Sequence, residues 1–321
     1  MKMNNSIMRG QEKEQTFSVA IRSDAVQSLM RSALANEDVV KDLTATLISL
    51  VAKPENEKLR KCKPDSIVAA ALQGATMGLS LALQHYSVVP YQDSANFQIS
   101  YRGLNALAMD TKMYEKLGVR EVLEGEFVGA DPLTGESMMK WITDPSERAK
   151  RPIVGYYAYY RLKDGFSNSL YWSHDEILDH ADTYAPAFSR KKYEDLIAGK
   201  ISQSDGGLGS PWYGMPNSTG HKKMCKKTVL KQLLSDGIAP VSTKLAKALH
   251  YDDLQTKGGE VIFSDDTRIA SANADEIIAD VKVVEKEPAT VQTESTDEKS
   301  NRIPSYGSGD GQQLDIFTPG A

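Results

Sequence analysis

The feature that most constrains the fold is a long stretch that would be apolar on nearly every side of a helix. Residues 66–83 read SIVAAALQGATMGLSLAL, and the Pro-Asp at 64–65 supplies typical helix-start residues. Such a helix must be buried, so other elements have to surround it. Gly74 and Gly78 lower its helix propensity, which suggests that another backbone packs closely against it.

The hydrophobic period then changes from that of helices to that of strands. YSVVPY (86–91) and NFQISY (96–101) have strand-like composition and are separated by QDSA, which predicts a hairpin. Helical spacing returns over residues 103–113. Three later segments are typical of strands: VREVLEGEFV (119–128), PIVGYYAYYRL (152–162) and NSLYWS (168–173), the last two joined by KDGF. We therefore predict an α+β fold in which small antiparallel sheets or hairpins pack with helices.

Helical patterns also precede and follow these strands. They cover residues 23–35, 37–51, 173–181, 221–231 and 242–249. Ser173 and Glu176 would form a capping box at the third of these helices. Beyond residue 254 the periodicity is lost, and Ser, Thr, Asp and Glu become frequent. We predict a flexible N-terminus at 1–16, a single core domain at 17–254, and a disordered acidic tail at 255–321.

The charge distribution separates the tail from the rest of the chain. The 321 residues have a formal net charge of −5. Residues 255–321 hold 6 Lys and Arg against 13 Asp and Glu, so the tail carries −7 and the first 254 residues carry +2. Residues 186–232 are strongly basic, with 9 basic and 3 acidic residues. A local surface of that kind can hold an anionic polymer whatever the net charge of the chain.

Other features predict a protein of the cytoplasm. There is no run of about eighteen apolar residues, so no transmembrane helix is expected. The polar N-terminus lacks the apolar segment of a signal peptide. The two cysteines, Cys62 and Cys225, are too few for a disulfide framework and too far apart for a zinc knuckle. We expect no membrane segment and no cofactor.

The segment HKKMCKKTVLK, residues 221–231, concentrates the basic charge. At about 100° per residue its five lysines fall within one half of a helical wheel, and Met224, Cys225, Thr228 and Val229 occupy the other half. No Asp or Glu occurs between residues 206 and 235. A merely solvated face normally interleaves both signs, so this one favours anion binding, although lysine faces are common on ordinary helices.

Aromatic residues accompany the basic ones. Trp212 lies upstream of the lysine segment, RKK occupies residues 190–192, and Tyr101 and Arg102 follow the predicted hairpin. Basic grooves with aromatic platforms hold single strands, because every base offers a π-face and every nucleotide a phosphate. The tyrosines of the YYAYY run are more typical of a strand or core.

Three segments, in matching order and spacing, resemble the RecT/Red-beta family of phage single-strand annealing proteins, on its RecT side. They are LRKCKPDSIVAAALQGATMGLSLAL (59–83), YSVVPYQDSANFQISYRGLNALA (86–108), and SPW (210–212) followed by HKKMCKKTVLKQLL (221–234). The likeness spans about residues 17–253. The aromatic Tyr86 and a long Gly-rich loop after Gly199 depart from the family pattern.

The resemblance implies a protein that coats single-stranded DNA, anneals complementary strands without ATP, and assembles into a homo-oligomeric ring or helical filament. It also implies a 5′→3′ exonuclease partner and the cytosol of a bacterial host. We call the second of these segments, residues 86–108, the hairpin–helix block. By position, it contains Gln98, Tyr101 and Arg102. The complete set of predicted DNA-binding residues is Gln98, Tyr101, Arg102, Arg190, Lys191, Lys192, Trp212, His221, Lys222, Lys223, Lys226, Lys227 and Lys231.

Annealing makes and breaks no covalent bond, so we predict that the protein is not an enzyme. The chain has no G-x-x-x-x-G-K-[ST] loop, which disfavours an ATP-driven recombinase. A metal-dependent DNA nuclease is one alternative, with Glu121, Glu124 and Glu126 near one strand, but their uneven spacing is more typical of an exposed face. A sequence-specific duplex DNA-binding protein is another, but lysines suit phosphates better than base edges.

A run of His and Asp could suggest a metal site. It comprises His174, Asp175, Asp179, His180 and Asp182. A helix capped by Ser173 explains these residues more simply, so no metal site is predicted.

The tail ends in the short motif QLDIF. It is similar to the peptide with which bacterial replication proteins dock on the sliding clamp, and its residues are Gln313, Leu314, Asp315, Ile316 and Phe317. Such short motifs also arise by chance in disordered ends. Its place on a long tether favours docking on a partner, since a tether raises local concentration. A host single-strand-binding protein is another possible partner of the tail.

Overall fold

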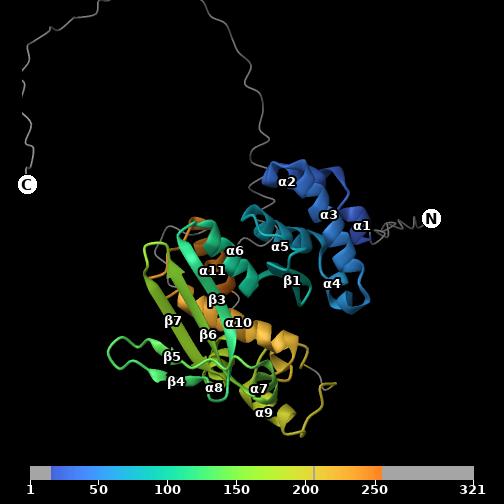
Figure 1. The fold of residues 1–321 in the computed structure, drawn as a ribbon. Coiled ribbons are helices and arrows are strands. Elements are labelled where there is room, and N and C mark those ends of the chain that lie inside the picture. Colours follow the sequence, from blue (N-terminus) through green and yellow to red (C-terminus); the bar gives the residue numbers. More distant parts are fainter. Residues whose placement is uncertain (1–15, 205–206, 255–321) are drawn as a thin grey trace, which may run out of the picture. The chain divides into compact units, whose positions relative to one another are not determined.

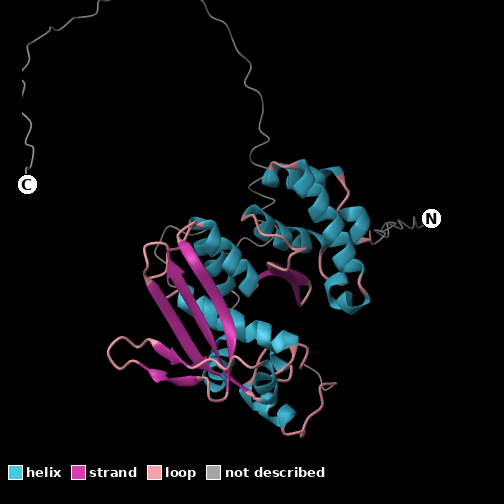
Figure 2. Cartoon of the chain, in the orientation of Figure 1, coloured by secondary structure: helices cyan, strands magenta, loops and turns pink. Residues whose placement is uncertain are grey.

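The computed structural model describes residues 16–204 and 207–254, and it confirms the α+β class (Figures 1 and 2). In the described part, helices pack with a two-stranded hairpin, a three-stranded sheet and a short two-stranded ribbon, all antiparallel. Apart from residue 16, the predicted flexible N-terminus lies outside the described residues, and so does the predicted tail at 255–321.

The described part of the chain begins with helices. They are α1 (Phe17–Ala20), α2 (Asp24–Leu34), α3 (Glu37–Ala52), the 3-10 helix η1 (Pro54–Asn56), α4 (Glu57–Arg60) and α5 (Pro64–Thr76). Ser23 caps α2 by accepting a hydrogen bond from a backbone N–H of the first turn, and Asn36 caps α3 in the same way. These two helices confirm the predictions at 23–35 and 37–51. Each begins directly after a polar residue whose side chain satisfies backbone N–H groups of the first turn.

Helix α5 is buried, as predicted, but it ends at Thr76 rather than near residue 83. Gly78 adopts a φ of +81°, in the left-handed region that typically ends a helix. A Cβ at Gly74 would lie 2.5 Å from the Tyr86 ring. The close neighbour of this glycine is therefore a tyrosine side chain, and the expectation of a second backbone is wrong. The Tyr86 hydroxyl donates a 2.9 Å hydrogen bond to the Ala71 carbonyl, which joins α5 to the hairpin.

The hairpin follows the prediction but has a tighter turn. β1 (Tyr86–Tyr91) pairs with β2 (Ser94–Ile99), so that Tyr86 lies opposite Ile99 and Tyr91 opposite Ser94. Only Gln92 and Asp93 remain for the turn, and Gln92 adopts a φ of +54°, as two-residue hairpin loops require. α6 (Tyr101–Asp110) follows directly, slightly before the helix predicted at 103–113.

Three longer strands form the main sheet. β3 (Tyr114–Leu123), β6 (Ile153–Leu162) and β7 (Ser167–Ser173) lie in the order β3-β6-β7. The strand predicted at 119–128 is divided between β3 and β4 (Phe127–Ala130), which pairs with β5 (Ser137–Met139).

Side chains alternate along β6. Tyr156 and Tyr160 are buried, whereas Tyr157 and Tyr159 are half-buried on the opposite face. The prediction that the YYAYY tyrosines belong to a strand or the core is therefore confirmed. All four lie in β6, and two of them, Tyr156 and Tyr160, are core residues.

The remaining described helices lie between or after these strands in the chain. They are α7 (Pro145–Lys150), α8 (His174–Tyr184), α9 (Arg190–Ile197), the 3-10 helix η2 (Pro211–Tyr213), α10 (Thr219–Leu234) and α11 (Thr243–Asp253). Of these, α8 and α10 pack on the sheet. α10 crosses one face of the sheet, where it contacts β3, β6 and β7, and it also contacts α6 (Figures 1 and 2). Ser173 and Glu176 form the predicted capping box of α8. Over residues 16–204 and 207–254, we find no helix with the length and apolar character needed to cross a membrane.

Candidate nucleic-acid interface

Helix α10 carries the lysine-rich segment, and much of its surface lies in the interior. Cys225, Val229 and Leu230 are fully buried against the sheet and neighbouring helices. Lys227 is buried too, with only 8% of its surface exposed. The half of the helical wheel that holds the lysines is therefore not a continuous cationic face.

Acidic residues from distant segments neutralise part of the lysine cluster. Lys227 Nζ lies 2.5 Å from Asp252 Oδ1 in α11, and Lys231 Nζ lies 2.9 Å from Asp252 Oδ2. Asp253 also pairs with Lys231. The expectation of a lysine face without counter-charges is wrong, because a packed helix meets elements that are remote in the sequence.

Lys227, Asp252 and Lys231 form an ion network in the core. Burial tends to raise the pKa of Asp252, but the two ammonium groups outweigh it and hold that pKa below its usual value. Burial lowers the pKa of Lys227. Burial also opposes the charge of Lys231, but Asp252 and Asp253 raise its pKa overall. In this structure the two lysines join α10 to α11, and carboxylates of α11 pair with both ammonium groups.

The other three lysines of α10 contact residues of α6, of β3 and of the segment before β1. Lys226 Nζ is 5.8 Å from the centroid of the Tyr101 ring and 3.0 Å from Glu121 Oε1. Lys222 lies 4.0 Å from the same carboxylate oxygen. The exposed Arg102 has its Nε 3.5 Å from the Tyr101 hydroxyl. We define the α6–α10 patch as Tyr101, Arg102, Lys222, Lys223 and Lys226.

A short segment before β1 links the two helices of the patch. The Lys223 ammonium donates a 3.1 Å hydrogen bond to the side-chain oxygen of Gln84, and the Ser100 hydroxyl donates a 2.7 Å bond to the Gln84 carbonyl. The Ser100 hydroxyl also accepts hydrogen bonds from the first backbone N–H groups of α6. A Cβ at Gly103 would lie 2.1 Å from the His85 carbonyl oxygen, so only glycine permits this approach. The hairpin–helix block thereby holds the start of α6 next to the lysines.

A groove of about 600 Å³ adjoins the patch. It lies between α3, η1, the segment before β1 and β1 itself, and Lys53, Asn56 and Gln84 are among its polar lining residues. Ser87 also lines it, and Gln98 lies opposite Ser87 across the hairpin, so their side chains share one face. Gln84 therefore borders both the groove and the patch.

Trp212 and His221 are core residues in this structure. Only 4% of Trp212 and none of His221 is exposed. His221 Nδ1 lies 2.8 Å from the Trp212 carbonyl oxygen, and burial lowers the pKa of His221 to about 4, so its ring is neutral at neutral pH. The Trp212 ring packs on Phe188, with 5.6 Å between the ring centroids. Both rings are occupied by protein contacts rather than presented to a base.

Arg190 is held by three carboxylates. Its guanidinium contacts Glu194, Asp179 and Asp175, and hydrogen bonding to Glu194 is the main cause that raises its already high pKa. The two lysines at 191–192 are exposed on α9. α9 packs on α8 and lies well away from α6 (Figure 1). The structure therefore does not bring these three residues to the α6–α10 patch, and their DNA contacts stay predictions.

The carboxylates near β3 do not converge. Glu126 is fully buried and accepts hydrogen bonds from two backbone N–H groups and from Arg148. Glu121 pairs with lysines of α10, and Glu124 is exposed. The expectation of an exposed face is wrong for Glu126, because its charge is matched by Arg148. These three residues do not form the carboxylate cluster that a metal-dependent nuclease uses.

Sequence analysis did not assign three residues to this region: Gln84, Asp252, and Glu121, which it considered only as part of a carboxylate face. Gln84 and Lys223 are separated by 139 positions in the chain. No local pattern indicates such a contact, because hydrophobic period and capping report only on neighbours within a few turns.

The combined features define a class of protein. Two helices carry cations to one place, an aromatic ring lies between them, and a groove with polar lining residues adjoins them. This combination is typical of proteins that bind a nucleic-acid strand through its phosphates and bases.

Comparison with known proteins narrows the class to a family. Residues 41–269 match the sequence model of the RecT family, and the chain belongs to that family. It is 29% identical over 267 residues to an uncharacterized protein, YqaK, of Bacillus subtilis (strain 168), covering 79% of this chain and 81% of that protein. It is 26% identical over 251 residues to Protein RecT of Escherichia coli (strain K12), covering 73% of this chain and 82% of that protein. Membership of the RecT family supports a role in DNA recombination by single-strand annealing.

Proposed function

We propose that this protein binds single-stranded DNA along the α6–α10 patch and the adjoining groove, and that it anneals complementary strands without ATP. One observation carries the proposal: two of the three family blocks meet in space. The hairpin–helix block supplies Tyr101 and Arg102. The block in α10 supplies Lys222, Lys223 and Lys226.

Annealing requires two polyanions to approach while their base edges stay free to pair. Lysine and arginine neutralise phosphates without reading the sequence. Tyr101 offers an aromatic face, and stacking of one base contributes about 1–3 kcal/mol. In the unbound protein Glu121 positions Lys222 and Lys226. A phosphate would replace that carboxylate as their partner, so the cations are already directed towards the strand.

One subunit offers only a short cationic path, so we infer that copies assemble along the strand as a ring or a helical filament. The repeated patch holds one strand extended while a second strand samples its register. Correct pairing then adds stacking and hydrogen bonds that a mismatched register lacks. A 5′→3′ exonuclease would supply the single strands. The chemistry needs no nucleophile or general base, because no covalent bond changes.

Two charge reversals test the patch. We expect Arg102→Glu combined with Lys223→Glu to lower affinity for a single-stranded oligonucleotide at least about tenfold, because phosphate contacts become repulsive. Both side chains reach the surface, so the fold should be retained. Fluorescence anisotropy of a labelled oligonucleotide measures binding. Quenching between complementary labelled strands, without ATP, measures annealing.

The matched control is Lys140→Glu combined with Lys163→Glu. Both lysines are exposed and lie outside the patch, and the change in net charge is the same. Its affinity should stay within about threefold of that of the unchanged protein, since screening weakens distant charges. Equal losses in the two variants would contradict a localised patch.

The affinity of the unchanged protein for single-stranded DNA should also fall with salt. For each tenfold rise in salt concentration, the logarithm of the binding constant should fall by about 0.7 per neutralised phosphate.

Lys227 is unsuitable for this test. A glutamate there would place a second carboxylate beside Asp252 in the core, and the variant would lose stability whatever its role in DNA binding.

The nuclease alternative is tested separately. A nuclease would degrade the labelled strand when Mg²⁺ is added, whereas an annealing protein would leave it intact.

A further inference from the structure

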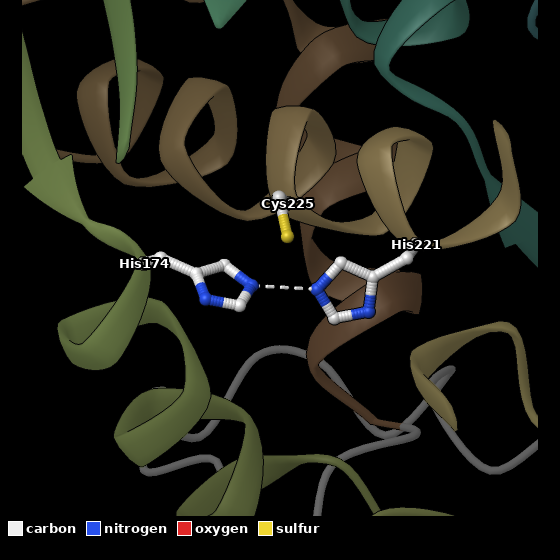
Figure 3. A group of neighbouring side chains, drawn as sticks. All are labelled: His174, His221 and Cys225. Carbon is white, nitrogen blue, oxygen red and sulfur yellow. Dashed lines mark hydrogen bonds between the residues drawn. The ribbon is translucent and has the colours of Figure 1, made fainter. Parts of the chain in front are cut away.

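A second cluster of functional groups lies beneath α10. His174 is the first residue of α8, and His221 and Cys225 lie one turn apart on α10. The three potential ligand atoms all lie within 4.8 Å of one another, and His221 and Cys225 are fully buried. Figure 3 shows the two imidazole rings facing each other and the Cys225 sulfur pointing toward the gap between them. The proposed DNA contacts do not use this cluster.

We propose that His174, His221 and Cys225 form a binding site for one transition-metal ion, with Zn²⁺ as the expected occupant. Two imidazole nitrogens and one thiolate are a common ligand set for zinc. A ligand set of nitrogen and sulfur disfavours Mg²⁺ and Ca²⁺, which prefer oxygen. Three protein ligands leave the fourth tetrahedral position for water.

The surroundings of His221 suit a metal ligand. Its Nδ1 lies 2.8 Å from the Trp212 carbonyl oxygen, so Nδ1 carries the proton that is donated to that oxygen. Nε2 is then left with its lone pair directed at the cluster. Metal-bound histidines typically have such a second hydrogen bond, which sets the tautomer and the orientation of the ring. The spacing of His221 and Cys225 places both on one side of α10.

Two buried tyrosines support the same conclusion. The Tyr156 hydroxyl is buried beside Cys225 and has no hydrogen-bond partner among the described residues. The Tyr193 hydroxyl is also buried without a partner in the described part of the chain, and its ring stacks on His221 at 5.4 Å. A neutral thiol is a weak acceptor, but a metal-bound thiolate accepts hydrogen bonds well. A negative sulfur would therefore give the buried Tyr156 hydroxyl a strong partner.

The two imidazole rings need only a small movement to share one ion. His174 Nε2 and His221 Nε2 lie 2.8 Å apart, which is a hydrogen-bond distance. Two nitrogens on one tetrahedral zinc would be about 3.3 Å apart, given Zn–N bonds of about 2.0–2.1 Å. A shift of about 0.5 Å would give the two nitrogens that separation, and His174 is the more accessible ring, since it is half-buried and His221 is fully buried. The metal would take the place of the shared proton between the rings.

Metal binding would connect the β7–α8 junction to α10. Lys222 and Lys226 directly follow the two α10 ligands in the chain. The ion would thereby hold the part of α10 that faces α6, although the metal site itself does not depend on the proposed DNA-binding function.

The test uses the full chain, stripped with a chelator and without DNA. We expect it to bind one equivalent of Co²⁺ with a sulfur-to-cobalt charge-transfer band, and one equivalent of Zn²⁺ that displaces the cobalt. Zn²⁺ at about 100 times its Kd should raise the thermal unfolding temperature, because an ion that binds only the folded state stabilises it. A full chain that gives no charge-transfer band and no thermal shift would overturn the proposal.

Variants assign the ligands. Cys225→Ser should abolish the charge-transfer band, and His174→Gln should weaken Co²⁺ binding at least about tenfold, since loss of one ligand removes a major part of the binding energy. Cys62→Ser and His180→Gln are matched controls, because Cys62 is the other buried cysteine and His180 lies on α8 outside the cluster. Circular dichroism without metal establishes that each variant folds. A band that persists in Cys225→Ser, or that disappears in Cys62→Ser, would contradict the assignment.

Discussion

Lys223 and Lys227 lie one turn apart on α10, yet their surroundings give them different roles. Lys223 reaches the surface and contacts Gln84, whereas Lys227 is buried and paired with Asp252. Residue type alone does not distinguish them. The difference follows from which neighbouring element covers each side of α10.

The carboxylate of Asp252 is the partner of the buried Lys227. We expect Asp252→Asn to lower the free energy of unfolding by about 3–5 kcal/mol, because Lys227 would be left charged in the core without its partner. Chemical denaturation at neutral pH measures the change. Asp38→Asn is a matched control, since Asp38 has an exposed side chain and its loss should change the free energy by no more than about 0.5 kcal/mol. Equal effects of the two changes would contradict a structural role for Asp252.

The same variant has a predicted pH dependence. The pKa of Asp252 is below its usual value in the folded protein. Its stabilising contribution is therefore complete above the ordinary pKa of about 4 and is lost as the pH falls through the lower folded value. An asparagine side chain does not titrate, so Asp252→Asn should lose less stability on acidification than the unchanged protein does. Denaturation series at neutral and acid pH would show this as a smaller slope, and equal slopes would contradict the lowered pKa.

At the scale of secondary structure, two serine-capped helices have different consequences for function. Ser100 caps α6 and also donates a hydrogen bond to Gln84, which contacts Lys223 of the patch. Ser173 caps α8 through its capping box with Glu176. The local chemistry is similar, but only the first cap lies at the proposed interface.

The two caps provide a matched pair of variants. Ser100→Ala and Ser173→Ala should each destabilise the protein by about 1 kcal/mol, because each leaves the first N–H groups of a helix unsatisfied. Only Ser100→Ala should also lower single-strand affinity, by about threefold or more, since the segment that positions Lys223 loses its link to α6. Thermal unfolding and anisotropy on the same samples separate the two effects. Unchanged affinity in Ser100→Ala would show that this cap does not organise the patch.

Caps and periodicity also explain which elements were predictable. The helices predicted at 23–35, 37–51 and 173–181 have side-chain caps that are visible in the sequence. The short helices α4 and α7, strand β5 and the pairing of β4 with β5 were not predicted. Each spans only one or two turns or a few residues, so it offers too little periodicity to be recognised.

At the scale of the whole molecule, the sequence joins a basic region to an acidic tail. We propose that the tail motif at 313–317, which lies outside the described residues, docks on the bacterial sliding clamp. The tail would bring annealed strands to a replication partner while the core domain holds the DNA. A long tether raises the local concentration of the second site without a rigid connection.

Docking of the tail makes a specific prediction. Leu314→Ala combined with Phe317→Ala should weaken clamp binding at least about tenfold, because two large apolar anchors are removed. Surface plasmon resonance on immobilised clamp measures the affinity. Val291→Ala combined with Ile303→Ala is the control, since it removes two apolar side chains from the same tail outside the motif. If the Leu314 and Phe317 variant bound as tightly as the control, the motif would have no docking role.

Local sequence patterns were enough to predict most elements and the family. The buried helix that begins near residue 64, the hairpin after it and the helix of α10 each follow from patterns within a few turns of chain, although the first of them ends at Thr76, before the predicted residue 83. The residues of three blocks were enough to indicate the RecT family, and the family match confirms that identification.

Which charges are available depends on tertiary packing. Asp252 neutralises Lys227, Glu121 positions Lys226, and Gln84 contacts Lys223, although each pair is far apart in the sequence. The same packing brings His174 to Cys225. The hydrophobic period of a helix predicts which of its sides is apolar. The partner of a buried charge depends instead on which element, distant in the sequence, packs against that part of the helix. For this reason the lysine helix was predictable as an element, whereas its division into core and surface lysines was not.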